Sequence, residues 1–161
     1  MTMVDYFRGL LKYEGWANTA TLDSMETVPP GQQSSTQAVR AHQVMAHNQL
    51  ARSVWLARVQ GRSEAVADWF PAWTVAETRR RAADLDRAWE ALLAGVTDAD
   101  LARTVTYTSS EGKSYASRLD EVLTHVFNHS TYHRGQVARL VTEAGGRRAS
   151  TDYIAMTRRT V

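Results

Sequence analysis

The sequence predicts an all-α protein, a four-helix bundle formed by a single domain over residues 1–161. Apolar residues recur at helical spacing in four long segments, and glycines or capping residues stand at the ends of these segments. The chain also has the size and composition of one ordinary globular domain, with 43% hydrophobic and 22% charged residues. Helix bundles build their cofactor sites in the core, from side chains that project inward.

The first two predicted helices lie in the N-terminal third of the chain. Residues 3–26 carry an amphipathic pattern that ends before Pro29, because two prolines and a glycine follow there. The second helix begins after the polar stretch QQSST and runs to Gly61, a natural C-terminal stop. Its apolar side includes Val44, Leu50, Ala51, Val54 and Trp55.

The third and fourth predicted helices each begin at a hydroxyl residue. Thr74 can cap the third helix while Glu77 reaches back to form a capping box, and this helix continues to Gly95. The fourth helix begins near Ser117, where the letters SRLD resemble a second capping box. It ends at Gly145, the first of two glycines.

The segment between the third and fourth helices predicts a short β-hairpin. Residues 101–117 contain β-branched and aromatic residues on both sides of Ser110, Glu111 and Gly112, a turn-forming group. A short helical tail is expected near residues 150–159, after the last glycines.

Composition excludes several kinds of site. The chain has no cysteine, so disulfides, thiolate catalysis and cysteine-based zinc or iron–sulfur centres are excluded, and a metal needs His, Asp, Glu or water. The 19 basic and 17 acidic residues give a net charge of only +2, which argues against a nucleic-acid partner. No stretch predicts a signal peptide or a membrane span, and we expect a cytoplasmic protein.

Three histidines lie at four-residue intervals on the fourth predicted helix. A helix turns about 100° per residue, which places His129 and His133 on its apolar side, one turn apart. Two imidazoles in this arrangement can converge on one ion. His125 lies about 40° further round, at the edge of the apolar side.

The second predicted helix carries two more histidines, His42 and His47, which are about 140° apart and cannot share a face. His47 lies among apolar residues and is the natural third ligand. His42 shares its side with Gln49 and Ser53, away from the predicted core. A single buried histidine is usually a structural residue with satisfied nitrogens, whereas three on two inward faces favour a metal site, because each must find partners when buried.

Several other residues near these histidines have two candidate roles. Glu121 can orient His125 or a water molecule, or it is an ordinary surface carboxylate one turn away. Gln136 can hold a ligand by a hydrogen bond or satisfy local polar groups. Tyr132 is expected to pack in the core, and Trp55 lines either a substrate pocket or the core. No catalytic residue can be assigned.

The sequence resembles the DinB/YfiT-like family over nearly its whole length. The resemblance lies in YEGWAN at residues 13–18, in HNQLARSVWLARVQG from His47, in HVFNHSTYHRGQV at residues 125–137, and in the final TDYIAM. It implies a bundle of up-down-down-up topology, usually dimeric. It also implies a divalent metal, most often zinc or nickel, held by three histidines that correspond to His47, His129 and His133.

The resemblance also implies a direction for the chemistry. Similar proteins include enzymes that use low-molecular-weight thiols, and three histidines leave a coordination position open for water or substrate. We expect a metal-dependent thiol S-transferase or hydrolase that activates a low-molecular-weight thiol or water for attack on a small electrophilic substrate. The alternative is a non-catalytic stress-response or metal-binding protein whose site is structural or vestigial.

Overall fold

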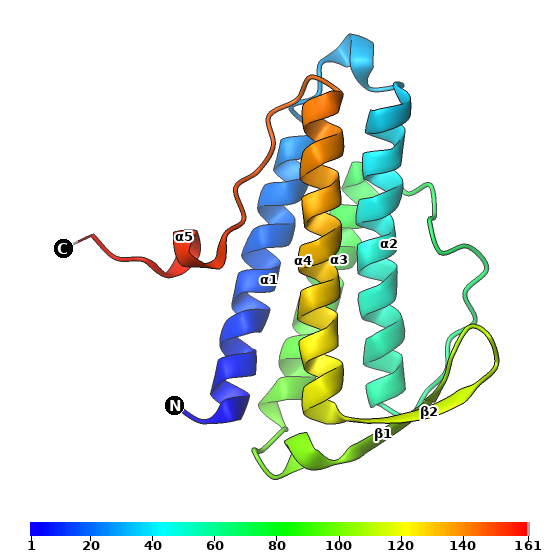
Figure 1. Ribbon diagram of the computed structural model, residues 1–161, viewed down its shortest axis with the longest axis vertical. Coiled ribbons are helices and arrows are strands. Elements are labelled where there is room, and N and C mark those ends of the chain that lie inside the picture. The colour runs from blue at the N-terminus through cyan, green and yellow to red at the C-terminus, as the bar shows by residue number, and fades with distance from the viewer. Residues whose placement is uncertain (161) are drawn as a thin grey trace.

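The structure, a computed structural model, describes residues 1–160 and consists mainly of four long helices packed side by side (Figure 1). These helices are α1 (Met3–Met25), α2 (Thr36–Val59), α3 (Val75–Ala94) and α4 (Leu119–Glu143). The shorter elements are the 3-10 turns η1 (Pro30–Gln32) and η2 (Asp100–Ala102), the strands β1 (Thr104–Thr108) and β2 (Ser114–Arg118), and helix α5 (Tyr153–Thr157). The predicted four-helix bundle with a hairpin is confirmed.

The helices run up, down, down and up, the order that the family resemblance implies (Figure 1). Because α2 and α3 point the same way, the chain must return along the bundle between them, and residues 60–74 make this connection. The connection runs along the outer side of α2, where Trp69 and Phe70 contact His47. Within residues 1–160, no helix is long and apolar enough to cross a membrane.

The helix ends agree with the sequence in most places. Thr74 caps α3 by accepting a hydrogen bond from the Glu77 backbone N–H, and Gly61 follows α2 with a φ of 72°. The predicted cap at Ser117 is wrong, since this residue belongs to strand β2 and α4 begins one residue after Arg118. The Glu121 carboxylate accepts the Arg118 backbone N–H instead, at 2.8 Å.

Strands β1 and β2 form the predicted antiparallel hairpin across the lower end of the bundle (Figure 1). Tyr107 lies opposite Tyr115 in the pairing, and Gly112 turns the chain with a φ of 78°. Tyr107 packs against Trp55 of α2, with ring centroids 4.9 Å apart. The hairpin therefore covers the C-terminal end of α2.

The apolar core is divided into two clusters at opposite ends of the bundle. The lower cluster joins the first half of α1 and α4 to the last turns of α2 and α3, and its buried residues include Phe7, Leu11, Leu56, Trp89, Leu93, Leu123, Val126 and Phe127. The upper cluster includes Leu22, Met25, Ala41, Val44, Met45, Val137, Leu140 and Val141. Each of α1, α2 and α4 contributes to both clusters.

A buried layer of polar side chains, which we call the polar layer, lies between the two apolar clusters. Arg134 donates to the Glu14 carboxylate at 2.7 Å and to Asn18 at 3.2 Å, and all three side chains are at most 2% exposed. Arg52 donates to Asp86 at 2.6 Å and lies 3.7 Å from Glu14. All four long helices contribute to the layer, and its two arginines balance its two carboxylates.

Two further residues show how tightly this layer is packed. Gly15 allows α1 to approach α3, because a Cβ atom there would lie 3.1 Å from Asp86 Oδ2. Gln49 is completely buried and accepts a hydrogen bond from Arg52 at 2.7 Å. The prediction that Gln49 lies away from the core is therefore wrong: α2 buries two sides, one toward α4 and one toward the polar layer.

Candidate metal centre

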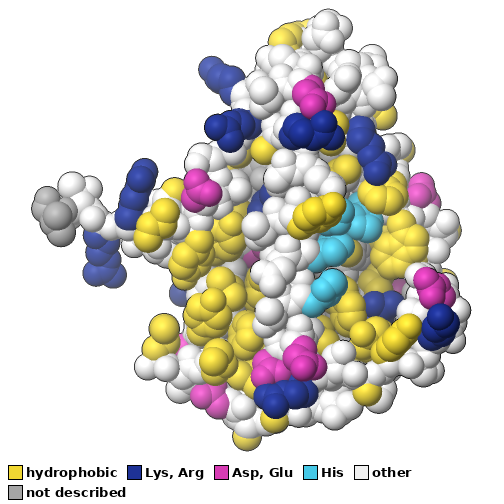
Figure 2. Space-filling view, in the orientation of Figure 1, with side chains coloured by type: hydrophobic (Ala, Val, Ile, Leu, Met, Phe, Trp, Pro, Cys, Tyr) yellow, Lys and Arg dark blue, Asp and Glu magenta, His cyan; other side chains and the backbone are white. Residues whose placement is uncertain are grey.

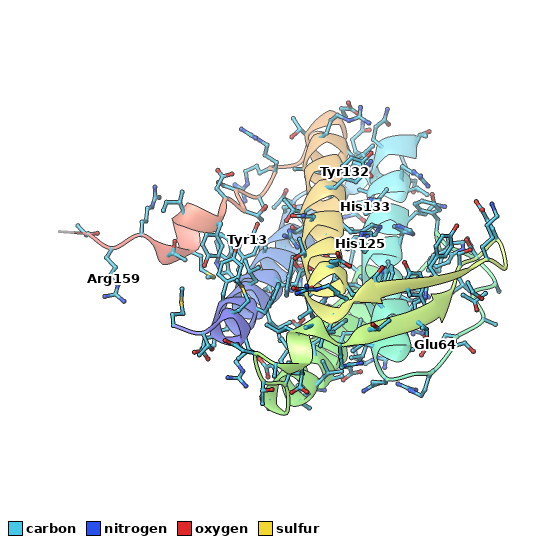
Figure 3. The ribbon with its side chains drawn as sticks, turned by 60° about the horizontal axis from the view of Figure 1, so that its bottom comes forward. Tyr13, Glu64, His125, Tyr132, His133 and Arg159 are labelled. Atoms are coloured by element: carbon cyan, nitrogen blue, oxygen red, sulfur yellow. The ribbon has the colours of Figure 1, made fainter. Side chains whose placement is uncertain are left out.

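Three histidines from two helices converge at mid-height on one side of the bundle. His47 comes from α2, His129 and His133 come from α4, and one ring nitrogen of each lies within 4.8 Å of the others. The Nε2 atoms of His129 and His133 are 3.2 Å apart. Figure 3 shows His133 and His125 on the side of α4 that faces α2.

The convergence follows from helix geometry and from the polar layer. A four-residue spacing places His129 one turn before His133 on the same side of α4. Arg134, the next residue, points away from them to Glu14 of α1, so α4 is held with its histidines toward α2. Arg52 of α2 is bound in the same layer, which restricts rotation of α2 and directs His47 toward α4.

Two of the three rings are oriented by hydrogen bonds. His47 Nδ1 lies 2.7 Å from the Trp69 carbonyl oxygen, and His133 Nδ1 lies 2.9 Å from Gln136 Oε1. Both oxygens accept hydrogen bonds, so each Nδ1 carries the proton and each Nε2 offers a lone pair. A histidine that binds a metal through one ring nitrogen normally donates a hydrogen bond from the other nitrogen in this way.

His129 has a different environment. Its Nε2 is 3.2 Å from His133 Nε2, and since Gln136 leaves that His133 nitrogen with a lone pair, His129 Nε2 is the donor of this contact when no ion lies between them. An ion held by both Nε2 atoms would take the place of this N–H and would leave the His129 proton on Nδ1.

Burial keeps the three rings neutral. It lowers the pKa of His129 to about 4, with further lowering by His133 and His47. Burial is also the main cause that lowers the pKa of His47 and that of His133, against the opposing effects of their hydrogen bonds to Trp69 and Gln136. The free imidazole pKa is about 6.5, so these residues need no deprotonation before they bind a metal at neutral pH.

The cluster fits a divalent ion held by three nitrogens. Zinc–nitrogen bonds of about 2.0–2.1 Å in tetrahedral geometry require nitrogens about 3.3 Å apart, close to the 3.2 Å between His129 and His133. Three neutral imidazoles leave room for a further ligand, which is typical of a catalytic metal site. The histidines reach the surface in a hollow bordered by hydrophobic and basic side chains (Figure 2).

The other predicted site residues occupy separate positions. His125 is exposed, and its ring lies 5.4 Å from that of His129 and 5.0 Å from that of Trp55. Gln136 contacts His133, as described above, whereas the Glu121 carboxylate caps α4. Tyr132 does not pack in the core as expected, because its side chain is 65% exposed.

Two residues beside the cluster were not predicted from the sequence. Phe70 stacks on His47 with ring centroids 4.5 Å apart, and the Trp69 carbonyl holds the same ring. Asp68 stabilises this turn by accepting the Phe70 backbone N–H at 2.8 Å. These residues lie in an irregular connection, where hydrophobic periodicity carries no information.

Together, the fold and the cluster define a class: a four-helix bundle in which two helices bring three neutral histidines close enough to hold a divalent metal ion. The chain belongs to the DinB family, which it matches over residues 3–160. It is 25% identical over 160 residues to Protein DinB of Bacillus subtilis (strain 168), covering 94% of this chain and 93% of that protein.

A solved structure shows the same fold. The crystal structure of a DinB-like protein from Bacillus cereus ATCC 10987 superposes with a TM-score of 0.64 and 19% sequence identity. The match covers 89% of this chain and 95% of that chain. The bundle is therefore shared across nearly the full length of both molecules.

Proposed function

We propose that the protein binds one divalent metal ion, zinc or nickel, through His47, His129 and His133, and that it is a metal-dependent enzyme for small electrophilic substrates. The observation that carries the proposal is the orientation of the rings. His47 donates a hydrogen bond to the Trp69 carbonyl and His133 donates one to Gln136, which leaves their Nε2 lone pairs aimed into the cluster, in a hollow open to solvent.

The chemistry follows from this donor set. A bound divalent ion lowers the pKa of a coordinated thiol or water and so supplies a nucleophile at neutral pH. Because the chain has no cysteine, a thiol must come from a low-molecular-weight co-substrate. The thiol releases its proton to solvent, its sulfur forms a bond to the electrophilic carbon, and the leaving group departs with the electron pair.

Metal content tests the first half of the proposal. We expect about one equivalent of zinc or nickel per chain after reconstitution and gel filtration, and a large loss of metal in His47→Ala, His129→Ala and His133→Ala. His42→Ala is the matched control, since His42 lies on the same helix as His47 and outside the cluster. Wild-type protein without metal, or an equal loss in the control, would contradict the proposal.

Thiol binding tests the second half. In cobalt-substituted protein, a coordinated thiolate gives an ultraviolet sulfur-to-metal charge-transfer band, and we expect this band with a low-molecular-weight thiol. Consumption of the thiol with a chromogenic electrophile should then depend on the metal. If metal binds but no thiol coordinates and no model ester or amide is hydrolysed, the enzyme proposal fails.

The second candidate is a metal-binding protein without turnover. One observation favours it: the Glu121 carboxylate, a candidate for orienting a water, already accepts the Arg118 backbone N–H at 2.8 Å. Metal uptake without any reaction in the thiol and hydrolysis assays would support this candidate.

We also propose a homodimer, which the family resemblance implies, and a location in the cytoplasm. Sedimentation equilibrium measures the mass, and a monomer at all concentrations would contradict the dimer.

A further inference from the structure

Arg58 of α2 is the one half-buried cation without a carboxylate partner in the part of the chain described here. Six arginines between residues 1 and 160 are buried or half-buried, and five have a carboxylate within 4.0 Å: Arg8, Arg52, Arg79, Arg81 and Arg134. No such ion pair exists for Arg58 within residues 1–160. A charge that has lost water without gaining a counterion is costly, which points to a ligand.

The local contacts of Arg58 orient its guanidinium without neutralising it. The group lies 4.6 Å from the centre of the Trp55 ring and 5.0 Å from that of Tyr107. One of its nitrogens donates to the Thr108 carbonyl oxygen at 3.1 Å. Aromatic faces and a single carbonyl hold the plane of the guanidinium, and the remaining N–H donors are free for an anion.

Arg58 lies in a cleft that shares one residue, Trp69, with the surroundings of the histidine cluster. This cleft, of about 390 Å³, is bounded by Val54 and Arg58 of α2, by Trp69 of the 60–74 connection, and by Thr108–Ser110 of the hairpin. Trp69 also holds His47 through its carbonyl oxygen. Trp69 therefore both lines the cleft and orients a ligand of the candidate metal centre.

The positions of Arg58 and His47 on α2 set the length of the ligand. They are 11 residues apart, which is three helical turns plus about 20°, so they share one side of the helix about 16 Å apart along its axis. The Arg58 guanidinium packs on the ring of Trp55, three residues closer to His47, which leaves roughly 12 Å along the helix axis for a ligand to span. Molecules of tripeptide size have this reach.

We propose that this cleft binds a carboxylate of the low-molecular-weight thiol, and that Arg58 is the residue that selects for it. The inference rests on the proposed function, because it places the thiol sulfur at the histidine cluster. The free N–H donors of Arg58 match the two oxygens of a carboxylate in bidentate geometry. The hydroxyl groups at Ser109 and Ser110 add donors to the same cleft.

The proposal predicts that Glu64 affects ligand affinity in the opposite direction to Arg58. It lines the cleft from the 60–74 connection but makes no ion pair with Arg58 within 4.0 Å, and its side chain is exposed (Figure 3). A carboxylate on this wall repels an anionic ligand. Removal of the Glu64 charge should therefore strengthen binding, whereas removal of the Arg58 charge should weaken it.

A ligand without a free thiol separates this inference from the metal chemistry. We would measure, by isothermal titration calorimetry on zinc-treated protein, the binding of S-methylglutathione and of its diethyl ester, which lacks the two carboxylates. We expect Arg58→Gln to raise the Kd of the acid about tenfold and Glu64→Gln to lower it severalfold, with little change for the ester. The control Arg87→Gln, at an exposed position on α3, should change neither.

Each outcome decides between specific alternatives. Arg58→Lys should restore part of the affinity, since it keeps the charge but not the bidentate geometry. If the wild type binds acid and ester equally, binds neither, or loses both equally in Arg58→Gln, then Arg58 only fastens the hairpin and the inference is overturned. Metal content of the same samples is measured separately, so a metal-free protein that still selects the acid through Arg58 would refute the proposed enzyme and leave the anion site standing.

Discussion

At the scale of single residues, the candidate metal centre depends on which ring nitrogen carries a proton. The Trp69 carbonyl fixes the tautomer of His47, and Gln136 fixes that of His133. The acceptor of the His47 proton lies in the 60–74 connection, whereas the acceptor of the His133 proton lies on α4, the helix of His133 itself. The orientations of the two ligands therefore depend on different residues. A backbone carbonyl cannot be removed by mutation, so Gln136 is the more direct target.

Substitution of Gln136 should weaken metal binding without abolishing it. Gln136→Leu removes the acceptor of the His133 Nδ1 proton, and loss of such an outer hydrogen bond costs about 10- to 100-fold in metal affinity. Gln136→Glu keeps an acceptor and is the control. Competition with a chromogenic chelator measures the affinity, and an unchanged Kd in Gln136→Leu would show that the contact is incidental.

The stability of the metal-free protein should fall as the pH falls from about 6.5 to 4. In the folded state burial lowers the pKa of His129 to about 4, while an unfolded histidine titrates near 6.5. Between these values the unfolded chain binds a proton that the folded chain rejects, at a cost on the order of 2 kcal/mol after solvent screening. Above 6.5 both states are neutral and this contribution does not change.

Urea unfolding at several pH values measures this effect. The His129→Gln variant should show a flatter dependence between pH 6.5 and 4, because it lacks the group whose pKa differs between the two states. An identical slope in the variant and the wild type would assign the pH dependence to other residues.

At the scale of elements, the Glu121 carboxylate at the N-terminus of α4 has two candidate roles. Glu121 accepts the Arg118 backbone N–H, which satisfies a group exposed by the first turn of the helix. The same residue was a candidate for orienting His125, one turn further along α4. The capping role predicts a loss of stability when Glu121 is replaced, whereas the orienting role predicts a loss of zinc affinity.

The Glu121→Ala substitution should lower the free energy of unfolding by about 1 kcal/mol and leave zinc affinity unchanged. Removal of the cap leaves the Arg118 N–H without its partner, whereas the three ligands keep their contacts. Chemical denaturation and metal titration of the same protein provide both numbers. A tenfold loss of zinc affinity at unchanged stability would instead place Glu121 in the site.

At the scale of the whole molecule, the polar layer ties four helices together at the height of the histidines. Glu14 of α1 contacts Arg134 of α4 and lies near Arg52 of α2, which in turn contacts Asp86 of α3. Apolar packing above and below the layer tolerates rotation of a helix more easily than a buried ion pair does. The layer therefore both stabilises the bundle and fixes the directions of α2 and α4.

Breaking the layer should cost more than breaking an ion pair on the surface. Glu14→Gln leaves Arg134 buried without its charge partner, and we expect a loss of about 3–5 kcal/mol in unfolding free energy. The surface control Glu143→Gln removes the exposed pair with Arg139 and should cost about 0.5 kcal/mol. If Glu14→Gln does not fold, the double substitution Glu14→Leu with Arg134→Met should recover stability, because no unpaired charge remains.

Local patterns in the sequence were sufficient to predict the helices, the hairpin and the side of its helix on which each of the three histidines lies. The angular position of His129 and His133 on one side of a helix, and of His47 on another, depends only on helical periodicity. The stop at Gly61 and the cap at Thr74 are likewise short-range features, and the structure confirms both. The errors at Ser117 and Tyr132 arose where a strand end or an exposed edge overrode the local pattern.

Tertiary packing alone decided what surrounds the histidines. Burial of Glu14, Arg52 and Arg134 is not expected from residue type, since charged side chains are buried only when distant partners compensate them. The contact of Trp69 with His47 spans 22 residues and depends on the path of an irregular connection. Periodicity therefore determines which way a side chain points along its own helix, whereas the partners it meets depend on how the four helices and the 60–74 connection pack together.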